Sequence, residues 1–289
     1  MTNSVSAGLR SVPLSMARLS TRDVRCVKTR SHGTLAARVT GKGPPVVLLH
    51  GVTDNRGTWH TVQSLLADAF ECHAIDLPGH GLSDIPDRAQ LVAEQAAAVD
   101  GYLEAVGLPP CVIVGSSMGG GVALGLAAHY ADRVRSVVTL GSIGAAFSIA
   151  AELTLLRYPF VAEQMARFAR TRTLRKTMYE RTLAPRFRAP DGAVERYWSG
   201  WFVEGRAQYM RAQLRRLDNG EPYPWLPSVR AKVIVVHGEL DPVVPVRVGH
   251  AVAARLVNAN KRVLRGVGHL PQVEVPAIVA AAVREAAAG

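Results

Sequence analysis

The sequence predicts an α/β fold: a mostly parallel central sheet with helices on both faces, interrupted by an inserted helical segment. Short apolar runs alternate with longer helical segments, an order that requires crossover connections between parallel strands. Two of these runs, Cys111–Val114 and Val233–Val236, are continuously apolar, as strands buried on both faces are. From about Ala145 to Pro227 no strand-like run occurs, which indicates the insertion.

The expected elements follow in chain order. Residues 1–33 are expected to form a flexible extension, and Leu35–Val39 an early antiparallel strand. Further strands are expected at Val46–Leu49, His73–Asp76, Cys111–Val114, Ser136–Leu140, Lys232–Val236 and Arg262–Leu264. Helices are expected at Thr58–Ala69, Arg88–Val106, Ser117–Tyr130 and from about Gln272. These elements divide the chain into an extension (1–33), a core (34–144 and 228–289) and a helical cap (145–227).

The composition fits one large domain with an insertion. The chain has 289 residues, of which 48% are hydrophobic, and this is enough to bury a full core. Three cysteines without C-x-x-C spacing argue against a disulfide framework and a metal site, and they fit a reducing compartment. No apolar run approaches the roughly 18 residues that a membrane-spanning helix needs. The net charge of +11 suggests anionic partners, but no nucleic-acid recognition motif accompanies it.

The N-terminal segment is strongly basic. It holds one acidic residue, Asp23, against six basic residues: Arg10, Arg18, Arg22, Arg25, Lys28 and Arg30. This bias resembles an organelle transit peptide. The excess of Arg over Lys and the abundance of Ala and Val along the whole chain are instead typical of a GC-rich bacterial coding sequence. A cytoplasmic protein is therefore expected, with organellar targeting as the alternative.

A G-x-S-x-G pentapeptide, Gly115–Gly119, stands where the Cys111–Val114 run meets a helix of small residues. A strand–turn–helix connection this tight holds its central residue in a strained conformation and accepts only small residues two positions away on either side. Glycines occupy both of those positions, so Ser117 is expected to be a nucleophile. Ser116 would take its place only if the turn slipped by one residue.

An acid and a base are expected after such a nucleophile, in the chain order Ser, Asp, His. Asp241 lies in the loop after Lys232–Val236, and His269 lies in the loop after Arg262–Leu264. Loops at the carboxyl ends of parallel strands meet at one edge of the sheet, so the three residues are expected to converge. Ser117 would attack a carbonyl carbon, His269 would take and return its proton, and Asp241 would orient the imidazole.

Other residues compete for these roles. Glu239 stands close to Asp241 in the same loop. Asp76 also ends a strand, but it precedes the nucleophile in the chain, which favours a loop-bracing role. His50 and His80 precede glycines in turns and are expected to make supporting hydrogen bonds. No spacing of ligand residues indicates a metal site, and no cofactor is expected.

Together these residues make the chain resemble the α/β-hydrolase superfamily, over roughly Val46–Ala280. Two further stretches carry the resemblance. Val46–Gly51 is similar to the first parallel strand of the family with its His-Gly turn, and Asp76–Ser83 is similar to the Asp-x-x-Gly-His-Gly-x-Ser loop of small capped esterases. The resemblance implies that the backbone N–H groups of Val52 and Met118 form an oxyanion hole, in which one donor is typically worth a rate factor of about 10²–10³.

The resemblance also implies a reaction. A cofactor-independent serine hydrolase is expected, acting on a carboxylic ester of a small to medium, mostly apolar substrate through an acyl-enzyme on Ser117. C–C bond hydrolases, lactonases, thioesterases and cofactor-free haloperoxidases keep the same three residues and remain alternatives, because a fold does not determine its chemistry. Dehalogenases and epoxide hydrolases use an aspartate nucleophile, so the serine counts against them. A non-enzymatic ligand-binding or membrane-docking protein is the further alternative.

The segment 145–227 is expected to lie over the catalytic edge as a cap that excludes water and shapes a pocket. Trp59 and Ile143, in loops beside the expected site, are candidate substrate contacts. The cap adds further candidates, each of which also fits ordinary packing inside the cap: Trp198, Trp201, Phe202, Tyr209 and Met210.

The cap also carries a basic stretch. Between Arg167 and Arg188 eight basic residues accompany one acidic residue, Glu180. This stretch fits a solvated helix face, or else a weak association with an anionic lipid surface. The expected partner is otherwise a small-molecule, ester-type substrate.

Overall fold

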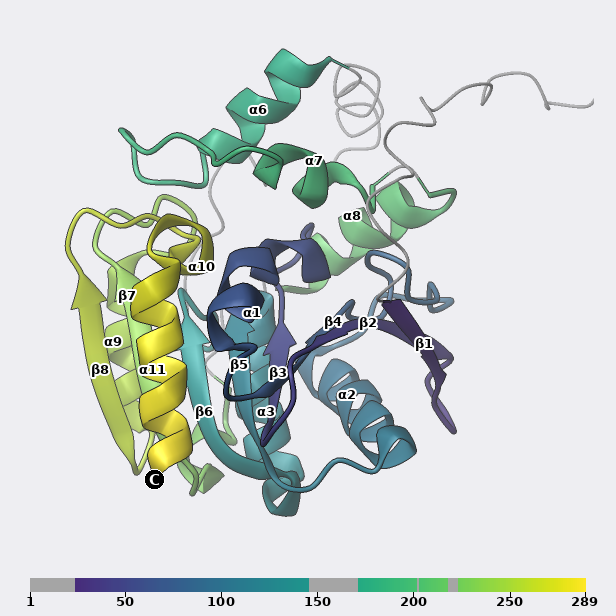
Figure 1. The fold of residues 1–289 in the computed structure, drawn as a ribbon, viewed down its shortest axis with the longest axis vertical. Helices are drawn as coiled ribbons and strands as arrows, with labels where there is room; N and C mark the ends of the chain where they lie inside the picture. The colour runs from purple at the N-terminus through teal and green to yellow at the C-terminus, as the bar shows by residue number, and fades with distance from the viewer. Residues whose placement is uncertain (1–23, 146–170, 202, 218–222) are drawn as a thin grey trace, which may run out of the picture.

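The structure is a computed structural model that describes residues 24–145, 171–201, 203–217 and 223–289 (Figure 1). Its centre is an eight-stranded sheet in the order β1-β2-β4-β3-β5-β6-β7-β8. The strands are β1 (Val24–Lys28), β2 (Thr34–Thr40), β3 (Pro45–Leu49), β4 (Glu71–Ile75), β5 (Cys111–Ser116), β6 (Val134–Leu140), β7 (Lys232–Gly238) and β8 (Ala259–Leu264). All neighbouring strands from β4 to β8 pair in parallel. The pairs β1–β2 and β2–β4 are antiparallel. The predicted mostly parallel sheet is confirmed.

Strand β1 lies inside the segment that was expected to be a flexible extension. It pairs with β2 in antiparallel register, Val24 opposite Arg38 and Lys28 opposite Thr34. The expectation of a flexible extension is therefore wrong for Val24–Lys28. An edge strand buries few side chains: Arg25 and Lys28 interrupt the apolar residues of β1, so no apolar run marks it.

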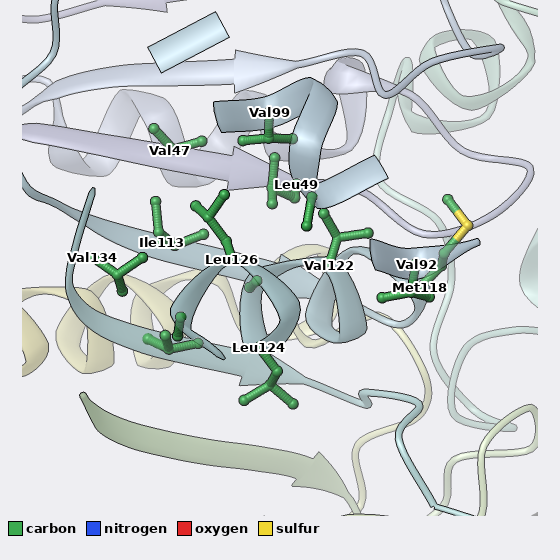
Figure 2. Close-up of a cluster of buried hydrophobic side chains, with 14 of the residues drawn as sticks. Val47, Leu49, Val92, Val99, Ile113, Met118, Val122, Leu124, Leu126 and Val134 are labelled. Carbon is green, nitrogen blue, oxygen red and sulfur yellow. The ribbon is translucent and has the colours of Figure 1, made fainter. Parts of the chain in front are cut away.

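Successive residues of the central strands face opposite helical layers. The core helices are α1 (His60–Leu66), α2 (Val92–Val106), α3 (Met118–His129), α9 (Val246–Arg255), α10 (Pro271–Glu274) and α11 (Pro276–Ala288). On one face α2, α3 and α9 cover a cluster that includes Val47, Leu49 and Ile113 (Figure 2). On the other face α1 and α11 cover the adjoining residues Leu48 and Val112. Burial on both faces explains why these strands are apolar throughout.

Two predicted helices begin later than their sequences suggest. The segment expected from Thr58 opens as a 3₁₀ turn, η2 (Arg56–Trp59), before α1. The helix expected from Arg88 begins at Val92, because the Glu94 carboxylate accepts the N–H of Leu91 at 2.6 Å and satisfies the helix end.

Three helices lie over the carboxyl ends of the strands: α6 (Arg172–Glu180), α7 (Ala193–Trp198) and α8 (Arg206–Leu217) (Figure 1). The buried Arg206 guanidinium anchors α8 by donating to the carbonyl oxygens of Gly81 (2.9 Å) and Ser83 (3.3 Å). Near α7, a Cβ on Gly200 would lie 2.9 Å from the Cα of Gly81, so the two backbones are in direct contact. No helix in the described ranges combines the length and apolarity needed to cross a membrane.

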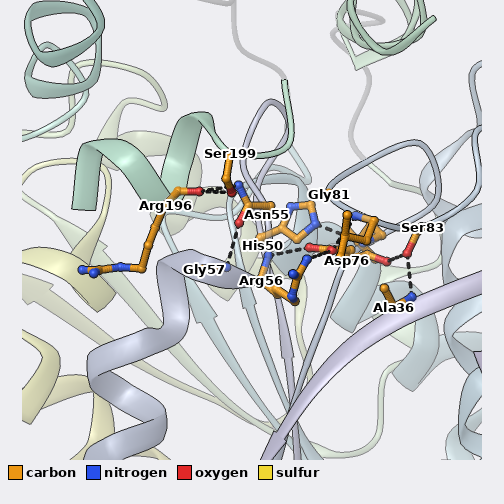
Figure 3. Close-up of polar contacts among 12 residues, drawn as sticks. Ala36, His50, Asn55, Arg56, Gly57, Asp76, Gly81, Ser83, Arg196 and Ser199 are labelled. Carbon is orange, nitrogen blue, oxygen red and sulfur yellow. Dashed lines mark hydrogen bonds and ion pairs between the residues drawn. The ribbon is translucent and has the colours of Figure 1, made fainter. Parts of the chain in front are cut away.

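The loop after β4 is held by Asp76, whose side chain is fully buried. Its Oδ1 accepts the N–H of Arg56 at 2.7 Å, and its Oδ2 accepts the N–H of Leu82 at 2.8 Å and pairs with the Arg56 guanidinium (Figure 3). Ser83 Oγ donates to the Asp76 carbonyl and accepts the N–H of Ala36 at 2.9 Å. Asp76 therefore ties the loop to β2 and η2, the loop-bracing role that its position in the chain predicted.

Asp76→Ala is expected to lower the free energy of unfolding by about 3–5 kcal/mol, because a largely buried guanidinium and two N–H donors lose their acceptor. Urea unfolding followed by circular dichroism measures the change. Asp68→Ala is the matched control, since Asp68 pairs with Arg284 but its side chain is 73% exposed. The control should cost less than about 1 kcal/mol. Equal losses in the two variants would contradict the bracing role.

A second buried carboxyl, Asp54, lies in the turn after β3. It is 3% exposed, and its Oδ1 accepts the N–H of Asn55 at 2.8 Å. Burial raises the pKa of Asp54 from 3.8 to about 7, assisted by the Asp76 charge and opposed by hydrogen bonds from Asn55 and Thr58. The folded chain therefore keeps this proton at pH values where the unfolded chain releases it.

Between the two pKa values the folded chain binds more protons at Asp54 than the unfolded chain, so this group's contribution to stability falls as the pH rises. Asp54→Asn keeps an acceptor oxygen but cannot ionise. The variant is expected to lose less stability than the wild type between about pH 4 and about pH 8. Melting temperatures measured across this range check the prediction, and parallel profiles for the two proteins would contradict it.

Candidate active site

Ser117 occupies the turn between β5 and α3 with φ 54° and ψ −117°, a conformation that few residues other than glycine adopt. Such backbone costs about 1–3 kcal/mol and persists only where its surroundings enforce it. Its N–H donates to the Leu140 carbonyl at 2.8 Å, and its own carbonyl accepts the N–H groups of Gly120 (3.0 Å) and Ile143 (3.3 Å). Backbone hydrogen bonds on both sides therefore hold the strained residue in place.

The flanking glycines are required by space. A Cβ on Gly115 would lie 2.1 Å from the carbonyl oxygen of Gly119, and a Cβ on Gly119 would lie 2.3 Å from that of Leu49. A Cβ on Gly51 would lie 3.0 Å from the Cβ of Ser117, so the turn after β3 lies directly against the serine. The motif thus has the steric form that its sequence predicted.

Ser116 points the other way. It is fully buried, and its Oγ accepts a hydrogen bond from Gln272 Nε2 at 3.1 Å. A side chain enclosed and bonded in this manner is not available to a substrate. The slipped turn that would have presented Ser116 does not occur.

Asp241 and His269 meet at the same edge of the sheet. His269 Nδ1 lies 2.8 Å from Asp241 Oδ2, and Asp241 Oδ1 accepts the N–H groups of Val243 and Val244, both at 2.8 Å. His237 Nε2 lies 2.8 Å from the Val244 carbonyl, which can only accept, so this nitrogen carries a proton; it also lies 3.4 Å from Asp241 Oδ2. The sequence analysis missed His237, because nothing in its local pattern separates it from other histidines.

Opposing effects act on the ionisation of Asp241. Burial by itself raises the pKa of Asp241, but the His269 charge and the hydrogen bonds from His237, His269 and Val244 outweigh burial and hold the pKa well below its usual range. The carboxylate is therefore ionised wherever the protein is folded near neutrality. A negative Asp241 favours a proton on the facing Nδ1 of His269, which leaves Nε2 as the basic nitrogen.

Gly141 links this pair to the serine. A Cβ at Gly141, which has a φ of 52°, would lie 3.0 Å from Asp241 Oδ2 and 3.2 Å from His269 Nδ1. Its neighbour Leu140 accepts the N–H of Ser117. Ser117, Asp241 and His269 are therefore gathered around the end of β6, although they are far apart in the chain.

The loop of His269 is bonded to the cap through a buried carboxylate. Glu274 accepts the N–H groups of Gly268 (2.9 Å), Leu270 (3.3 Å) and Ala184 (3.0 Å), the last of which belongs to the segment between α6 and α7. The N–H of His269 donates to the carbonyl of Thr182 at 3.0 Å. The sequence analysis did not identify Glu274, whose two loop contacts only the tertiary structure brings together.

The remaining polar candidates have structural partners. Glu239 is exposed and accepts the N–H of Gly266 at 3.1 Å. His50 Nε2 accepts the N–H of Leu77 at 3.0 Å, so its Nδ1 donates to the Gly51 carbonyl. Burial lowers the pKa of His50 to about 4 and that of His80 to about 3, which keeps both rings neutral. These contacts match the supporting roles expected of the two histidines.

The backbone donors implied by the family resemblance lie beside the serine. Met118 opens α3 directly after Ser117, and Val52 follows Gly51, whose Cα lies against that serine. Within the described part of the chain, neither N–H donates to a protein acceptor. Two unpaired N–H groups next to one nucleophile can stabilise a developing oxyanion.

Several predicted pocket residues prove to be packing residues. Trp59 is fully buried between the sheet, α1 and α11, so the predicted substrate contact is wrong: its indole faces the core. Trp198 is 3% exposed inside the cap, where its Nε1 donates to the Arg175 carbonyl. Tyr209 and Met210 are also buried. Trp198 packs with Tyr179 and Leu183 of the cap, whereas the ring of Tyr209 lies against Gly79 and His80 of the loop after β4. Whether any of these three cap residues contacts substrate stays a prediction.

Two other predicted residues lie nearer the serine. Ile143 is 4% exposed, and its N–H bonds the Ser117 carbonyl. Trp201 is half-buried and donates from Nε1 to the Thr53 carbonyl at 2.7 Å. Phe202 lies outside the described residues. The pocket itself stays a prediction.

The basic stretch is partly neutralised. Arg172 pairs with Glu195 at 2.8 Å, Lys176 lies 3.8 Å from Glu180, and Arg175 is buried. Arg167 and Arg170 are among the residues not described. Within the described ranges, no group of His, Cys, Asp and Glu side chains is arranged to hold a metal ion.

Comparisons with known proteins place the chain in a family. The profile of the α/β-hydrolase fold family matches residues 44–276. An uncharacterized protein of Mycobacterium tuberculosis is 31% identical over 263 residues, covering 84% of this chain and 74% of that protein. A 2-hydroxymuconate semialdehyde hydrolase of a Pseudomonas species is 28% identical, over 81% of this chain and 83% of its own length.

Among solved structures, a thermophilic esterase from Thermogutta terrifontis superimposes with a TM-score of 0.73 at 25% identity, covering 91% of this chain and 97% of that chain. The sheet order, the serine turn and the family profile agree. The chain therefore belongs to the α/β-hydrolase fold family and is a hydrolase.

Proposed function

We propose that this hydrolase cleaves carboxylic esters of small to medium, mostly apolar substrates, with Ser117 as nucleophile, His269 as general base and acid, and Asp241 as the group that orients the imidazole. The observation that carries the proposal is the 2.8 Å contact between His269 Nδ1 and Asp241 Oδ2 at the edge of the sheet where the strained Ser117 is presented. This arrangement supports a histidine whose Nε2 accepts the serine proton.

The proposed reaction has two halves. Ser117 Oγ bonds to the carbonyl carbon while its proton passes to His269 Nε2 and then to the leaving alcohol. Water then attacks the acyl ester with His269 as base, releasing the carboxylic acid and restoring the serine hydroxyl. In both halves the N–H groups of Val52 and Met118 would hold the oxyanion, and the N-terminus of α3 adds its positive dipole.

C–C bond hydrolysis is the second candidate. The same groups would serve it, and the 28% identical relative is named a 2-hydroxymuconate semialdehyde hydrolase. An esterase and a meta-cleavage product hydrolase both superimpose on the chain, so superposition does not separate the two reactions. Lactones and thioesters would require no further catalytic group.

The cellular compartment of the protein and its binding to lipid surfaces are further parts of the proposal. Cys26, Cys72 and Cys111 are free thiols, which supports a cytoplasmic protein. Association of the basic cap with anionic lipid would be weak, because its described arginines and lysine are paired or buried in part.

Ser117→Ala is expected to abolish hydrolysis of a p-nitrophenyl ester series from acetate to palmitate while the protein stays folded, because no other serine of the described residues occupies such a strained turn. Initial rates for wild type and variant measure this, and the preferred chain length sizes the acyl pocket. Ser116→Ala is the matched control and should keep most of the activity, since Ser116 bonds Gln272.

Retention of more than a few per cent of the activity by Ser117→Ala would contradict the proposal. Labelling by a fluorophosphonate probe separates the remaining cases. A labelled Ser117 with no turnover of any ester would favour the C–C hydrolase, which hydrolysis of a vinylogous diketone would then test. An unlabelled Ser117 would favour a non-enzymatic binding protein.

Asp241→Asn is expected to lower kcat by roughly 10³–10⁴-fold, because the amide favours the wrong imidazole tautomer. Glu239→Gln is the control: Glu239 lies two residues away in the same loop but is exposed, so kcat should change little. The two rates on the best ester of the series decide between these carboxylates. A larger loss in Glu239→Gln would make Glu239 the acid.

A further inference from the structure

The turn after β3, residues 51–55, contains the second strained residue of the described chain. Thr53 has a φ of 68°, and Val52 before it has no positive φ. The N–H of Asp54 returns to the Gly51 carbonyl at 3.3 Å, which closes a turn of four residues. This is the pattern of a type II turn, in which the third position strongly favours glycine.

A threonine at that position requires outside support. Its branched Cβ makes a positive φ costly, about 1–3 kcal/mol, so the conformation persists only where other contacts enforce it. The Gly51–Asp54 hydrogen bond, at 3.3 Å, is long and gives little of this support.

The supporting contacts come from the cap, from α7 itself and from the residues just after it. Tyr197 Oη lies 2.7 Å from Thr53 Oγ1, and Trp201 Nε1 donates to the Thr53 carbonyl at 2.7 Å. The side chain and the main chain of one strained residue are therefore each held by a cap aromatic, although these aromatics are more than 140 positions away in the chain.

Asn55, two positions after Thr53, is held by the same segment. Asn55 Nδ2 donates to the carbonyls of Arg196 (2.8 Å) and Tyr197 (2.9 Å), and its Oδ1 accepts the N–H of Gly57 (Figure 3). The cap thus bonds the turn at two residues, Thr53 and Asn55.

We propose that Tyr197 and Trp201 are positioning residues: by holding Thr53 in its left-handed conformation they keep the turn closed and the Val52 N–H aimed at the oxyanion. The inference rests on the proposed serine-hydrolase function. It makes a docked cap a condition for the full rate of the chemical step, in addition to any contact that the cap makes with substrate.

The physical reason lies in the peptide plane between Gly51 and Val52. Its carbonyl is held by His50 Nδ1 (2.7 Å) and by the Asp54 N–H, and its N–H points to the opposite side. If Thr53 relaxes to a negative φ, Asp54 moves and the plane can tilt. Hydrogen bonds to an oxyanion weaken steeply with misalignment, so the transition state is affected more than substrate binding.

The test compares Tyr197→Phe and Trp201→Phe with wild type on the best p-nitrophenyl ester. Each variant is expected to lower kcat about 10-fold, less than the 10²–10³ typical when an oxyanion donor is removed, with little change in KM. Tyr102→Phe is the matched control. The Tyr102 hydroxyl also bonds a buried side chain, that of His73 at 2.9 Å, but this contact joins α2 to β4 and does not involve the cap. The control should retain wild-type kcat, and melting temperatures confirm that all variants fold.

Two measurements separate a loss of oxyanion positioning from a nonspecific destabilisation of the active site. A trifluoromethyl ketone matched to the best acyl chain adds Ser117 Oγ to its carbonyl carbon, the serine proton goes to His269, and an oxyanion remains. Its inhibition constant should rise by the factor by which kcat falls, while that of the product carboxylate stays constant. In a double-mutant cycle, Thr53→Val with Tyr197→Phe should lose no more than either change alone, because both remove one hydrogen bond.

The outcomes distinguish the two levels of the proposal. If wild type hydrolyses esters through Ser117 but Tyr197→Phe and Trp201→Phe behave like Tyr102→Phe, the positioning role is wrong and the hydrolase function stands. Additive losses in the cycle, or equal weakening of ketone and carboxylate, would also overturn positioning. If wild type shows no activity dependent on Ser117 and no probe labelling, the function fails and the inference fails with it.

Discussion

The close approach of two backbones at the carboxyl edge of the sheet is the constraint on which the site depends. The first turn of α3 lies so near the end of β3 that Gly119 has no room for a Cβ beside the Leu49 carbonyl. The same contact forces Ser117 into strained backbone and brings Gly51 against its side chain. A proposed nucleophile and a proposed oxyanion donor therefore take their relative positions from a single packing contact. The hydrogen bonds around them compensate for the strained backbone and keep it in place.

The cap takes part in this geometry through two of the loops that carry proposed catalytic groups. Glu274 joins the His269 loop to Ala184, and Trp201 holds Thr53 in the turn after β3. A cap attached only by apolar contacts would tolerate sliding, whereas directional hydrogen bonds to two loops define one docked position. Enclosure of a substrate and alignment of the reacting groups are in this way two results of the same set of contacts.

The elements that were predictable from the sequence have strong local patterns. Continuous apolar runs marked the central strands, and glycines two positions either side of Ser117 marked the turn, because each pattern reflects a local steric or burial requirement. Edge strand β1 escaped notice since one row of pairing buries few side chains. Trp59 was misassigned because a residue in a loop near the site can equally face the core, and the rotation of η2 against the sheet decides which.

The sequence by itself therefore determined the fold class and the residues able to do chemistry, since both follow from patterns within a few neighbouring positions. Only the tertiary structure decided which of those residues meet: that Asp241 faces His269 while Glu239 turns to Gly266, and that a threonine in a position suited to glycine is held by two aromatics of the cap. These pairings join residues from about 30 to about 150 positions apart in the chain. Packing of whole elements sets such distances, and no local propensity encodes them.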